Sequence, residues 1–200
     1  MNAAASPLPV SQAIDAVAVG ASAGGVNALL TLFDGLPRNF RLSVIVVLHQ
    51  PEDHESVLPQ VFAARTGLPS LEAMDKMPVQ PGTLYFAPPG YHLSVEEDRS
   101  FSLSCEPAIL FSRPSIDVLM SSAADAYGPA VAGMLLTGAS EDGAKGMADI
   151  GNAGGLTVVQ EPKEAQMAVM PLAALARRQP DFVLPLADIR KLLLQLDANR

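Results

Sequence analysis

The sequence predicts an α/β fold in three layers: a doubly wound, mostly parallel sheet covered by helices, with an added antiparallel hairpin. Short apolar runs rich in β-branched residues, such as Ser43–Leu48, are typical of parallel strands that are buried on both faces. Amphipathic stretches alternate with these runs, which favours right-handed crossovers of strand, helix and strand. Two runs of alternating polarity, His92–Val95 and Phe101–Ser104, flank the polar residues 96–100 and indicate the hairpin.

The first crossover helix is predicted from a stripe of Val26, Leu29, Leu30 and Phe33, which would pack on the sheet, and Gly35 ends it. Further strands are expected at residues 16–19, 83–87, 131–136, 156–159 and 182–184. Further helices are expected at residues 57–65, 116–127, 144–150, 172–178 and 189–196. Together they predict one domain, residues 14–198, preceded by a flexible tail of residues 1–13.

Composition argues against several classes of protein. With 200 residues, of which 49% are hydrophobic, the chain can bury a core, and its single cysteine, Cys105, excludes an internal disulfide or a zinc site built from several cysteines. The net charge of -8, with only 13 Lys and Arg residues, disfavours nucleic acid as a partner. Neither an apolar run of about 20 residues nor a secretory signal is present, so we expect a cytoplasmic location without membrane insertion.

A catalytic site is expected where the parallel strands end, because the loops there carry the functional groups of such sheets. After the first strand, residues 20–24 read Gly-Ala-Ser-Ala-Gly and match G-x-S-x-G, in which small neighbours let a serine occupy a sharp strand-to-helix turn. Ser22 is therefore a candidate nucleophile. Two alternatives remain open: Ser22 caps the following helix, or the turn binds a phosphate in a Rossmann-like sheet, which would favour glycine at position 22.

A serine nucleophile needs an adjacent base, and the chain has three histidines. His49 directly follows the second long apolar run, which predicts that it lies at the same sheet edge as Ser22. His54 and His92 could each line a cleft, but neither follows a strand in this way. The alternative for His49 is a strand-end histidine that is hydrogen-bonded to a nearby carbonyl.

A carboxylate that orients the imidazole would complete the set, and the loop after residues 131–136 offers two. Asp142 is preferred over Glu141, because Asp-Gly allows a tight turn that points a short side chain back across the sheet. The alternative is that Asp142 caps the helix beginning at Ala144. The chain order of Ser, His and Asp excludes the common lipase and esterase fold, in which the acid precedes the histidine.

Five segments together resemble the catalytic domain of the CheB-type chemotaxis protein-glutamate methylesterases, in the family's order and over about residues 14–190. They are VAVGASAGG at 17–25, LHQP at 48–51, YFAPPGYH at 85–92, RPSID at 113–117 and LTGASEDGAKG at 136–146. The resemblance implies that Ser22, His49 and Asp142 form a catalytic triad, and that backbone N–H groups near Ala23 and Ala139 form an oxyanion hole.

The resemblance also implies a reaction: hydrolysis of glutamate γ-methyl esters on the cytoplasmic helices of chemoreceptors to glutamate and methanol, with glutamine deamidation as a further activity. It implies no metal and no organic cofactor. His92, Arg113 and Ser115 are candidates for binding the substrate. Because a charge of -8 would repel an acidic receptor helix, we hypothesise that basic groups such as Arg113 lie near the cleft.

The sequence departs from the family's usual pattern at several positions. Ala23 replaces a usual Thr, Gln50 replaces a Met, Ser140-Glu141 stands in a loop that is usually Gly-Asn, and Leu172 replaces an Arg. Many members also carry an amino-terminal receiver domain, for which there is no room before Ser22. The sequence therefore predicts a stand-alone esterase domain that is unregulated in cis, regulated by a partner protein, or excised from a longer protein.

The alternative function is a non-catalytic module on the same fold, either for signalling or for binding a phosphate or nucleotide. Against nucleotide binding stand the serine at position 22 and the lack of an acidic residue at the end of the second strand, where His49 and Gln50 stand. Against a module without turnover stands the presence of all three candidate catalytic groups.

Overall fold

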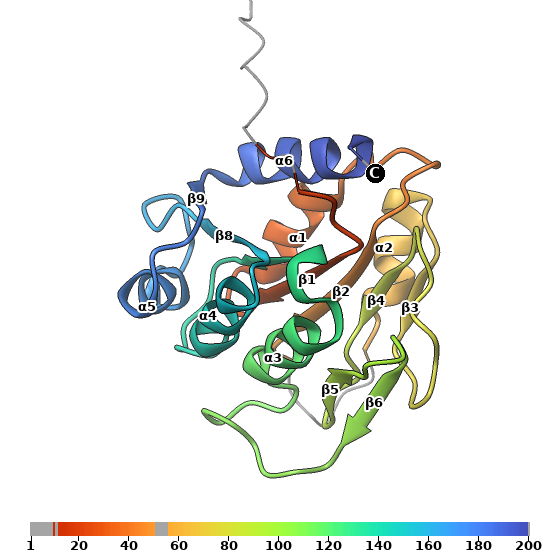
Figure 1. Ribbon diagram of the computed structural model, residues 1–200, viewed down its shortest axis with the longest axis horizontal. Helices are drawn as coiled ribbons and strands as arrows, with labels where there is room; N and C mark the ends of the chain where they lie inside the picture. The colour runs from red at the N-terminus through yellow and green to blue at the C-terminus, as the bar shows by residue number, and fades with distance from the viewer. Residues whose placement is uncertain (1–9, 11, 51–55, 200) are drawn as a thin grey trace, which may run out of the picture.

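The computed structural model describes residues 10, 12–50 and 56–199 of the chain (Figure 1). Among these, seven strands form one sheet in the order β3-β4-β2-β1-β7-β8-β9, and every neighbouring pair is parallel. The strands are β1 (Ala16–Ala21), β2 (Ser43–Leu48), β3 (Ser70–Glu72), β4 (Leu84–Phe86), β7 (Val131–Leu135), β8 (Leu156–Gln160) and β9 (Phe182–Leu184). The predicted three-layer α/β class is confirmed.

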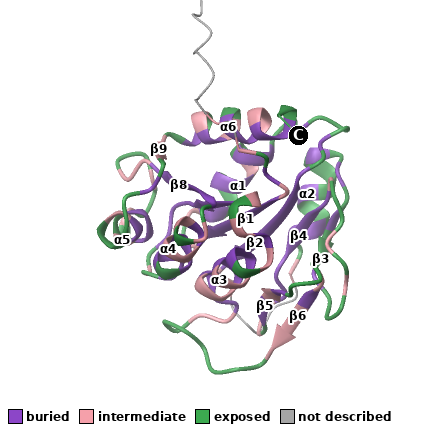
Figure 2. Ribbon diagram, in the orientation of Figure 1, coloured by how far each residue is buried: buried purple, intermediate pink, exposed green. Residues whose placement is uncertain are grey.

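Helices cover both faces of this sheet. Alternate strand residues point to opposite sides, and residues on both sides are buried, so each face needs a covering layer. The helices are α1 (Gly25–Phe33), α2 (Leu58–Thr66), α3 (Ile116–Tyr127), α4 (Ala144–Asn152), α5 (Val169–Arg177) and α6 (Leu186–Ala198), with a short 3₁₀ turn, η1 (Gly128–Ala130), after α3. Val17 and Val19 of β1 belong to the core that α1, α2 and α6 share, while Ala16 and Ala18 belong to the core beneath α3, α4 and α5. Figure 2 shows β1 and β2 buried along their whole length between these layers.

The predicted hairpin consists of β5 (His92–Val95) and β6 (Phe101–Ser104), which pair antiparallel in a two-stranded sheet of their own. The hairpin packs against the α3 side of the main sheet, where the Phe101 ring meets that of Tyr85 edge-on at 4.9 Å between centroids. The Val95 N–H also donates to the Ser122 hydroxyl of α3 at 3.0 Å. These contacts fix the hairpin beside the helix whose amino terminus reaches the candidate site.

Three details differ from the sequence prediction. In α1 the buried residues include Ala28, Leu29, Leu32 and Phe33, whereas Val26 is 43% exposed, so the stripe that packs on the sheet is shifted from the predicted one. Strand β3 was not predicted, and α5 begins three residues before the predicted Leu172, with Pro171 in its first turn. Proline is tolerated there because its missing N–H would have no partner within the helix.

The chain runs outward from β1 in two directions, through β2 and β4 on one side and through β7, β8 and β9 on the other. In open parallel sheets the crevice at such a reversal, outside the carboxyl ends of the strands, is the usual binding place.

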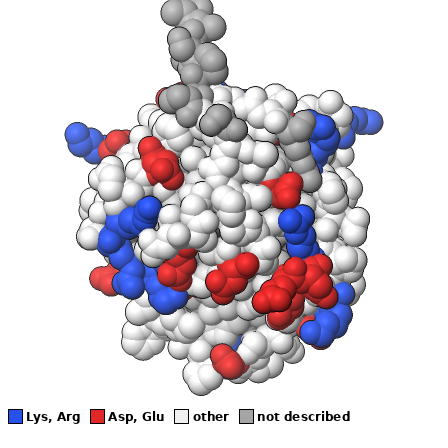
Figure 3. All heavy atoms as spheres, in the orientation of Figure 1, with Lys and Arg blue, Asp and Glu red and all other residues white. Residues whose placement is uncertain are grey.

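The face in Figure 3 carries acidic and basic side chains in small separate clusters, so neither sign of charge covers it. None of the described helices is both long and apolar enough to cross a membrane.

Candidate active site

Ser22 and His49 are neighbours because the strands before them pair in register. Ala21 of β1 lies opposite Leu48 of β2, and the His49 N–H donates to the Ala21 carbonyl at 3.1 Å. On the other side of β1, the Ser22 N–H donates to the carbonyl of Thr137, which follows β7, at 2.9 Å. The loops after β1, β2 and β7 therefore meet at Ser22.

The turn after Ser22 needs its glycines. Gly24 has a φ of 81°, and a Cβ on it would lie 2.7 Å from Oε1 of Gln166, while a Cβ on Gly25 would lie 2.5 Å from Cδ1 of Leu48. Gly24 is also the residue before the first turn of α1, and no side chain of the described residues caps that helix. The alternative that Ser22 caps α1 is therefore not what the structure shows.

His49 and Asp142 form a close polar contact at this edge. The imidazole Nε2 lies 2.8 Å from Oδ2 of Asp142, with the His49 side chain 12% exposed and that of Asp142 fully buried. Glu141, the other carboxylate of the same loop, is exposed. The contact assigns the proton to Nε2, because an ionised carboxylate only accepts, so Nδ1 is left as the acceptor nitrogen of a neutral imidazole.

Asp142 is held at the amino terminus of α3. Its Oδ1 accepts from the Ser115 hydroxyl at 2.8 Å and the Asp117 N–H at 3.0 Å, and its Oδ2 also accepts from the Ile116 N–H at 2.7 Å. Burial would raise the pKa of the Asp142 carboxyl, but the hydrogen bonds from His49 and from these groups hold the pKa below its ordinary value. The carboxylate therefore stays ionised, which suits a group that must orient an imidazole.

Two hollows meet at this edge. An open depression of about 580 Å³ is lined by Ser22, His49, Gln50, Leu110, Phe111, Ser112, Arg113, Pro114, Ala139 and Ser140. A groove of about 360 Å³, lined by Val26, Asn27 and Gln166 among others, shares Ser22, His49 and Gln50 with the depression. Ser22 thus lies where the two hollows join.

Two backbone N–H groups near Ser22 are available to a ligand. Within the described part of the chain, neither the N–H of Ala23 nor that of Ala139 has a hydrogen-bond acceptor. Ala23 follows Ser22 directly, and Ala139 lines the same depression. Donors in such positions can stabilise negative charge that develops on a substrate oxygen.

The CheB methylesterase family model matches residues 17–193, which span the sheet, both hollows and all three strand-end loops. The chain belongs to the CheB methylesterase family. A crystal structure of the Thermotoga maritima CheB methylesterase catalytic domain matches this fold with a TM-score of 0.86 and 29% identity, covering 92% of this chain and 98% of that one.

Relatives within the CheB methylesterase family differ in length. A putative protein-glutamate methylesterase/protein-glutamine glutaminase of Leptospira interrogans is 39% identical over 185 residues, which are 92% of this chain and 96% of the relative. Protein-glutamate methylesterase FrzG of Myxococcus xanthus is 35% identical over 179 residues, which are 90% of this chain and 54% of FrzG. The chain thus spans nearly all of the first relative and about half of the second.

The other candidate residues lie behind or beside the depression of this CheB-family domain. The His92 side chain is buried, with Nδ1 accepting from the Ser115 N–H at 3.1 Å and Nε2 lying 3.1 Å from the Pro107 carbonyl. Ser115 is fully buried and donates its hydroxyl to Asp142. The expectation that His92 and Ser115 bind substrate directly conflicts with this geometry, because their polar atoms are taken up and face away from solvent.

Arg113 does line the depression, but its guanidinium binds the chain itself. Its Nη1 donates to the carbonyls of Cys105 and Glu106 at 3.2 Å each. Arg113 thus ties together the two ends of the connection from β6 to α3. That its charge attracts an acidic substrate stays a prediction. His54 lies outside the described residues.

Sequence reasoning missed Ser112. Its hydroxyl lies 3.2 Å from Nδ1 of His49, the nitrogen that Asp142 leaves free. Ser112 follows no strand and belongs to no glycine-rich loop, so its place could not be found from strand order. It is, however, the residue before the RPSID segment, and that proximity to a family motif was a weak signal.

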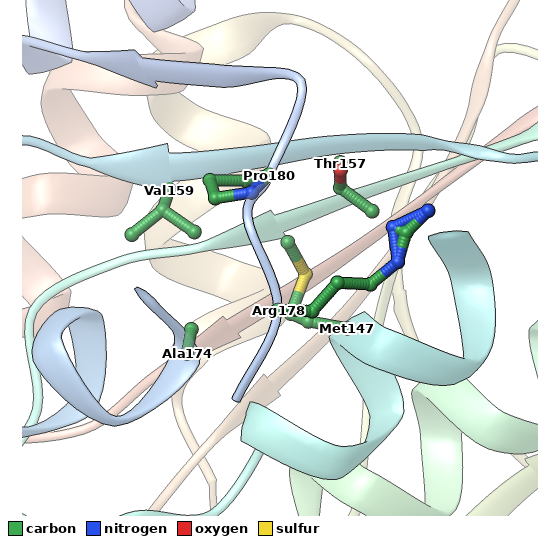
Figure 4. A pocket seen from close by; sticks show the side chains of 6 residues that line it. All are labelled: Met147, Thr157, Val159, Ala174, Arg178 and Pro180. Carbon is green, nitrogen blue, oxygen red and sulfur yellow. The ribbon is translucent and has the colours of Figure 1, made fainter. Parts of the chain in front are cut away.

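A further hollow lies between α4, α5 and β8, and none of its lining residues lines the two hollows at Ser22 (Figure 4). Its lining residues are Met147, Thr157, Val159, Ala174, Arg178 and Pro180, and its volume is about 10 Å³. That volume holds at most one water molecule. Among the described residues no group of three or more His, Cys, Asp or Glu side chains could hold a metal ion.

Proposed function

We propose that this chain hydrolyses glutamyl γ-methyl esters on the cytoplasmic helices of chemoreceptors, with Ser22 as nucleophile, His49 as general base and Asp142 as its orienting carboxylate. The contact of 2.8 Å between His49 Nε2 and Asp142, beside Ser22 at the junction of two hollows, carries the proposal. The names of the Leptospira and Myxococcus relatives support the choice of reaction.

In the first half of the reaction, Ser22 Oγ attacks the ester carbonyl carbon while its proton passes to His49. Because Nε2 donates to Asp142, the accepting nitrogen is Nδ1. The carbonyl oxygen becomes an oxyanion, towards which the N–H groups of Ala23 and Ala139 donate. Collapse of this intermediate breaks the bond to the methoxy oxygen, which takes the proton from Nδ1 and leaves as methanol.

In the second half, water attacks the acyl-enzyme on Ser22 and gives one proton to His49, which returns it to Ser22 Oγ as the ester bond breaks. The receptor side chain leaves Ser22 as glutamate, and the Ser22 hydroxyl and the neutral His49 imidazole are regenerated. An acyl-enzyme formed from a glutamine side chain would be the same, with ammonia leaving instead of methanol. Deamidation, for which the Leptospira relative is also named, therefore needs no additional group.

Ser112 is hydrogen-bonded to Nδ1 of His49, the nitrogen that must accept the proton of Ser22 in this mechanism. Its hydroxyl donates to Nδ1 of His49 at 3.2 Å, so it holds the base nitrogen in the free protein. The Ser22 hydroxyl must replace it before the proton can move. Since Asp142 already orients the imidazole through Nε2, the exchange leaves the ring in place.

The test is methanol release from a methylated cytoplasmic receptor fragment by the wild type and by Ser22→Ala. We expect release by the wild type and a loss on the order of 10⁴-fold or more in the variant, because removing the nucleophile removes the covalent pathway. Ser121→Ala is the matched control, since the Ser121 hydroxyl of α3 donates to Asp149 of α4 and neither residue lines either hollow. A folded wild type that neither releases methanol nor reacts with a fluorophosphonate at Ser22 would favour the non-catalytic module.

A further inference from the structure

An apolar turn stands exposed at the mouth of the candidate active site. It comprises Ile109, Leu110, Phe111 and Ser112, and we refer to it as the 109–112 turn. Phe111 is 103% exposed, Leu110 is 47% exposed and Ile109 is 38% exposed. An exposed group of large apolar side chains beside a functional site indicates a contact surface for a partner or ligand.

The backbone of the turn displays these side chains in an unusual way. Ile109 and Ser112 exchange both backbone hydrogen bonds, at 3.1 and 2.9 Å, and the two residues between them have positive φ, 48° at Leu110 and 64° at Phe111. Positive φ at both central positions is typical of a type I′ turn, which normally carries Asn-Gly. Bulky residues are disfavoured in this conformation, so a function outside the turn is the better reason for their presence.

The stem of the turn is held firmly although its tip is exposed. Arg113 donates to the carbonyls of Cys105 and Glu106, and His92 lies within hydrogen-bonding distance of the Pro107 carbonyl. Ser112 lies against His49. A ligand that binds Leu110 and Phe111 therefore meets a surface already in place, with little ordering cost.

Two apolar side chains of the 109–112 turn share one depression with Ser22. Leu110 and Phe111 line the same depression as Ser22, and its volume of about 580 Å³ lies in the range that holds a drug-sized ligand. That is more space than one ester side chain fills. Among the described residues that line it, Arg113 is the one Lys or Arg, and its guanidinium binds carbonyls of its own connection.

We propose that Leu110 and Phe111 form a subsite for an apolar side chain of the substrate helix, one helical turn away from the glutamyl ester that Ser22 attacks. The inference rests on the proposed function and names the substrate's neighbouring residue. On an α-helix, side chains three or four positions apart lie on one face with Cβ atoms about 5–6 Å apart. An ester at Ser22 therefore brings such a neighbour into the same depression.

The test uses synthetic helical peptides with one glutamyl γ-methyl ester and either Leu or Ser at the positions three and four residues away. The wild type should hydrolyse the Leu peptide with a kcat/KM about tenfold higher than the Ser peptide, mainly through KM, as expected for a hydrophobic subsite. The double variant Leu110→Asn with Phe111→Gly keeps the turn type and removes both side chains. With this double variant, kcat/KM for the Leu peptide should be about equal to kcat/KM for the Ser peptide.

The control variant is Met74→Ser, which removes an exposed apolar side chain that does not line either hollow. It should keep the wild-type preference for the Leu peptide. The inference is overturned if the double variant retains the preference, or if it loses hydrolysis of both peptides and of p-nitrophenyl acetate in parallel, because the turn would then act on the catalytic groups. A wild type that is labelled at Ser22 by a fluorophosphonate but cleaves neither peptide would overturn the proposed function, and this inference with it.

Discussion

The two ring nitrogens of His49 have different partners, and this difference defines what the histidine can do. Nε2 is fixed on the buried Asp142 carboxylate, while Nδ1 faces the open depression and meets the Ser112 hydroxyl. In the serine proteases used as the usual template, the nitrogens have the opposite roles, with Nδ1 on the aspartate. Since the triad is defined by geometry, either nitrogen can serve as base if the other is held.

Ser112→Ala tests whether the second serine competes for this base. We expect the variant to react faster with a fluorophosphonate at Ser22, by about two- to tenfold, because the net free energy of one neutral hydrogen bond is about 0.5–1.5 kcal/mol. The rate of labelling, measured by mass spectrometry, checks it, with Ser121→Ala as control. A tenfold slower reaction would instead show that the Ser112 hydroxyl is needed to hold the imidazole.

At the residue scale, strand order was enough to predict which loops meet at the candidate site. Ser22, His49 and Asp142 each lie in a loop that follows a predicted strand, and the structure brings these loops together at one sheet edge. Ser112 lies in an irregular connection whose path depends on contacts such as those of Arg113. Burial of Ser115 likewise depends on packing that no local pattern reveals.

At the scale of elements, α3 and α4 cap each other. Asp142 lies just before α4 but accepts from the first N–H groups of α3, and Asp117, in the first turn of α3, accepts from the Gly146 N–H of α4 at 2.7 Å. Burial raises the pKa of Asp117, and the nearby charge of Asp142 adds to this. The alternative that Asp142 caps the helix beginning at Ala144 is therefore not what the structure shows. Asp142 and Asp117 instead form a crossed pair, which couples the site to the packing of two helices.

Asp142→Asn should lower the free energy of unfolding at pH 7 by about 1–3 kcal/mol, because four donors face the carboxylate and an amide NH₂ would find no acceptor there. The folded-state pKa of Asp142 lies below the unfolded-state pKa of about 3.9. The wild-type advantage is therefore fully present above the unfolded-state pKa and is lost as the pH falls from there through the folded-state pKa.

Urea denaturation at pH 7 and at pH 3 measures both effects. The matched control is Glu141→Gln, which changes the exposed neighbouring carboxylate and should alter the free energy of unfolding by no more than about 0.5 kcal/mol. A wild-type advantage that is equally large at both pH values would mean that the carboxylate charge does not contribute through its hydrogen bonds.

The elements that were mispredicted have local physical reasons. Strand β3 has three residues, of which only Ser70 is buried, so it shows no apolar run. In α1 the sheet-facing side begins at Gly25, which packs against Leu48 and Ala21, and this leaves the next residue, Val26, on the exposed side. Long buried strands such as β2 were predicted with correct bounds, because their continuous apolar sequence has no other stable place than the middle of a sheet.

At the scale of the whole molecule, charge opposes the proposed substrate. The chain carries 13 Lys and Arg against 21 Asp and Glu, a net charge of -8. Hydrolysis turns a neutral ester into a carboxylate, so each turnover adds a negative charge to the receptor helix. Repulsion therefore favours release of product, but it also slows the approach of any substrate helix that already carries carboxylates.

This repulsion predicts an unusual salt dependence. For an ester peptide flanked by glutamates, kcat/KM should rise by roughly threefold as the salt concentration increases from about 10 to 150 mM, because the Debye length falls from about 30 to 8 Å. The same peptide flanked by glutamines is the control and should show a flat profile. Steady-state methanol release at a series of salt concentrations measures both peptides. If kcat/KM for the acidic peptide falls with salt instead, a local positive potential at the depression, with Arg113 as its source, outweighs the net charge of the molecule.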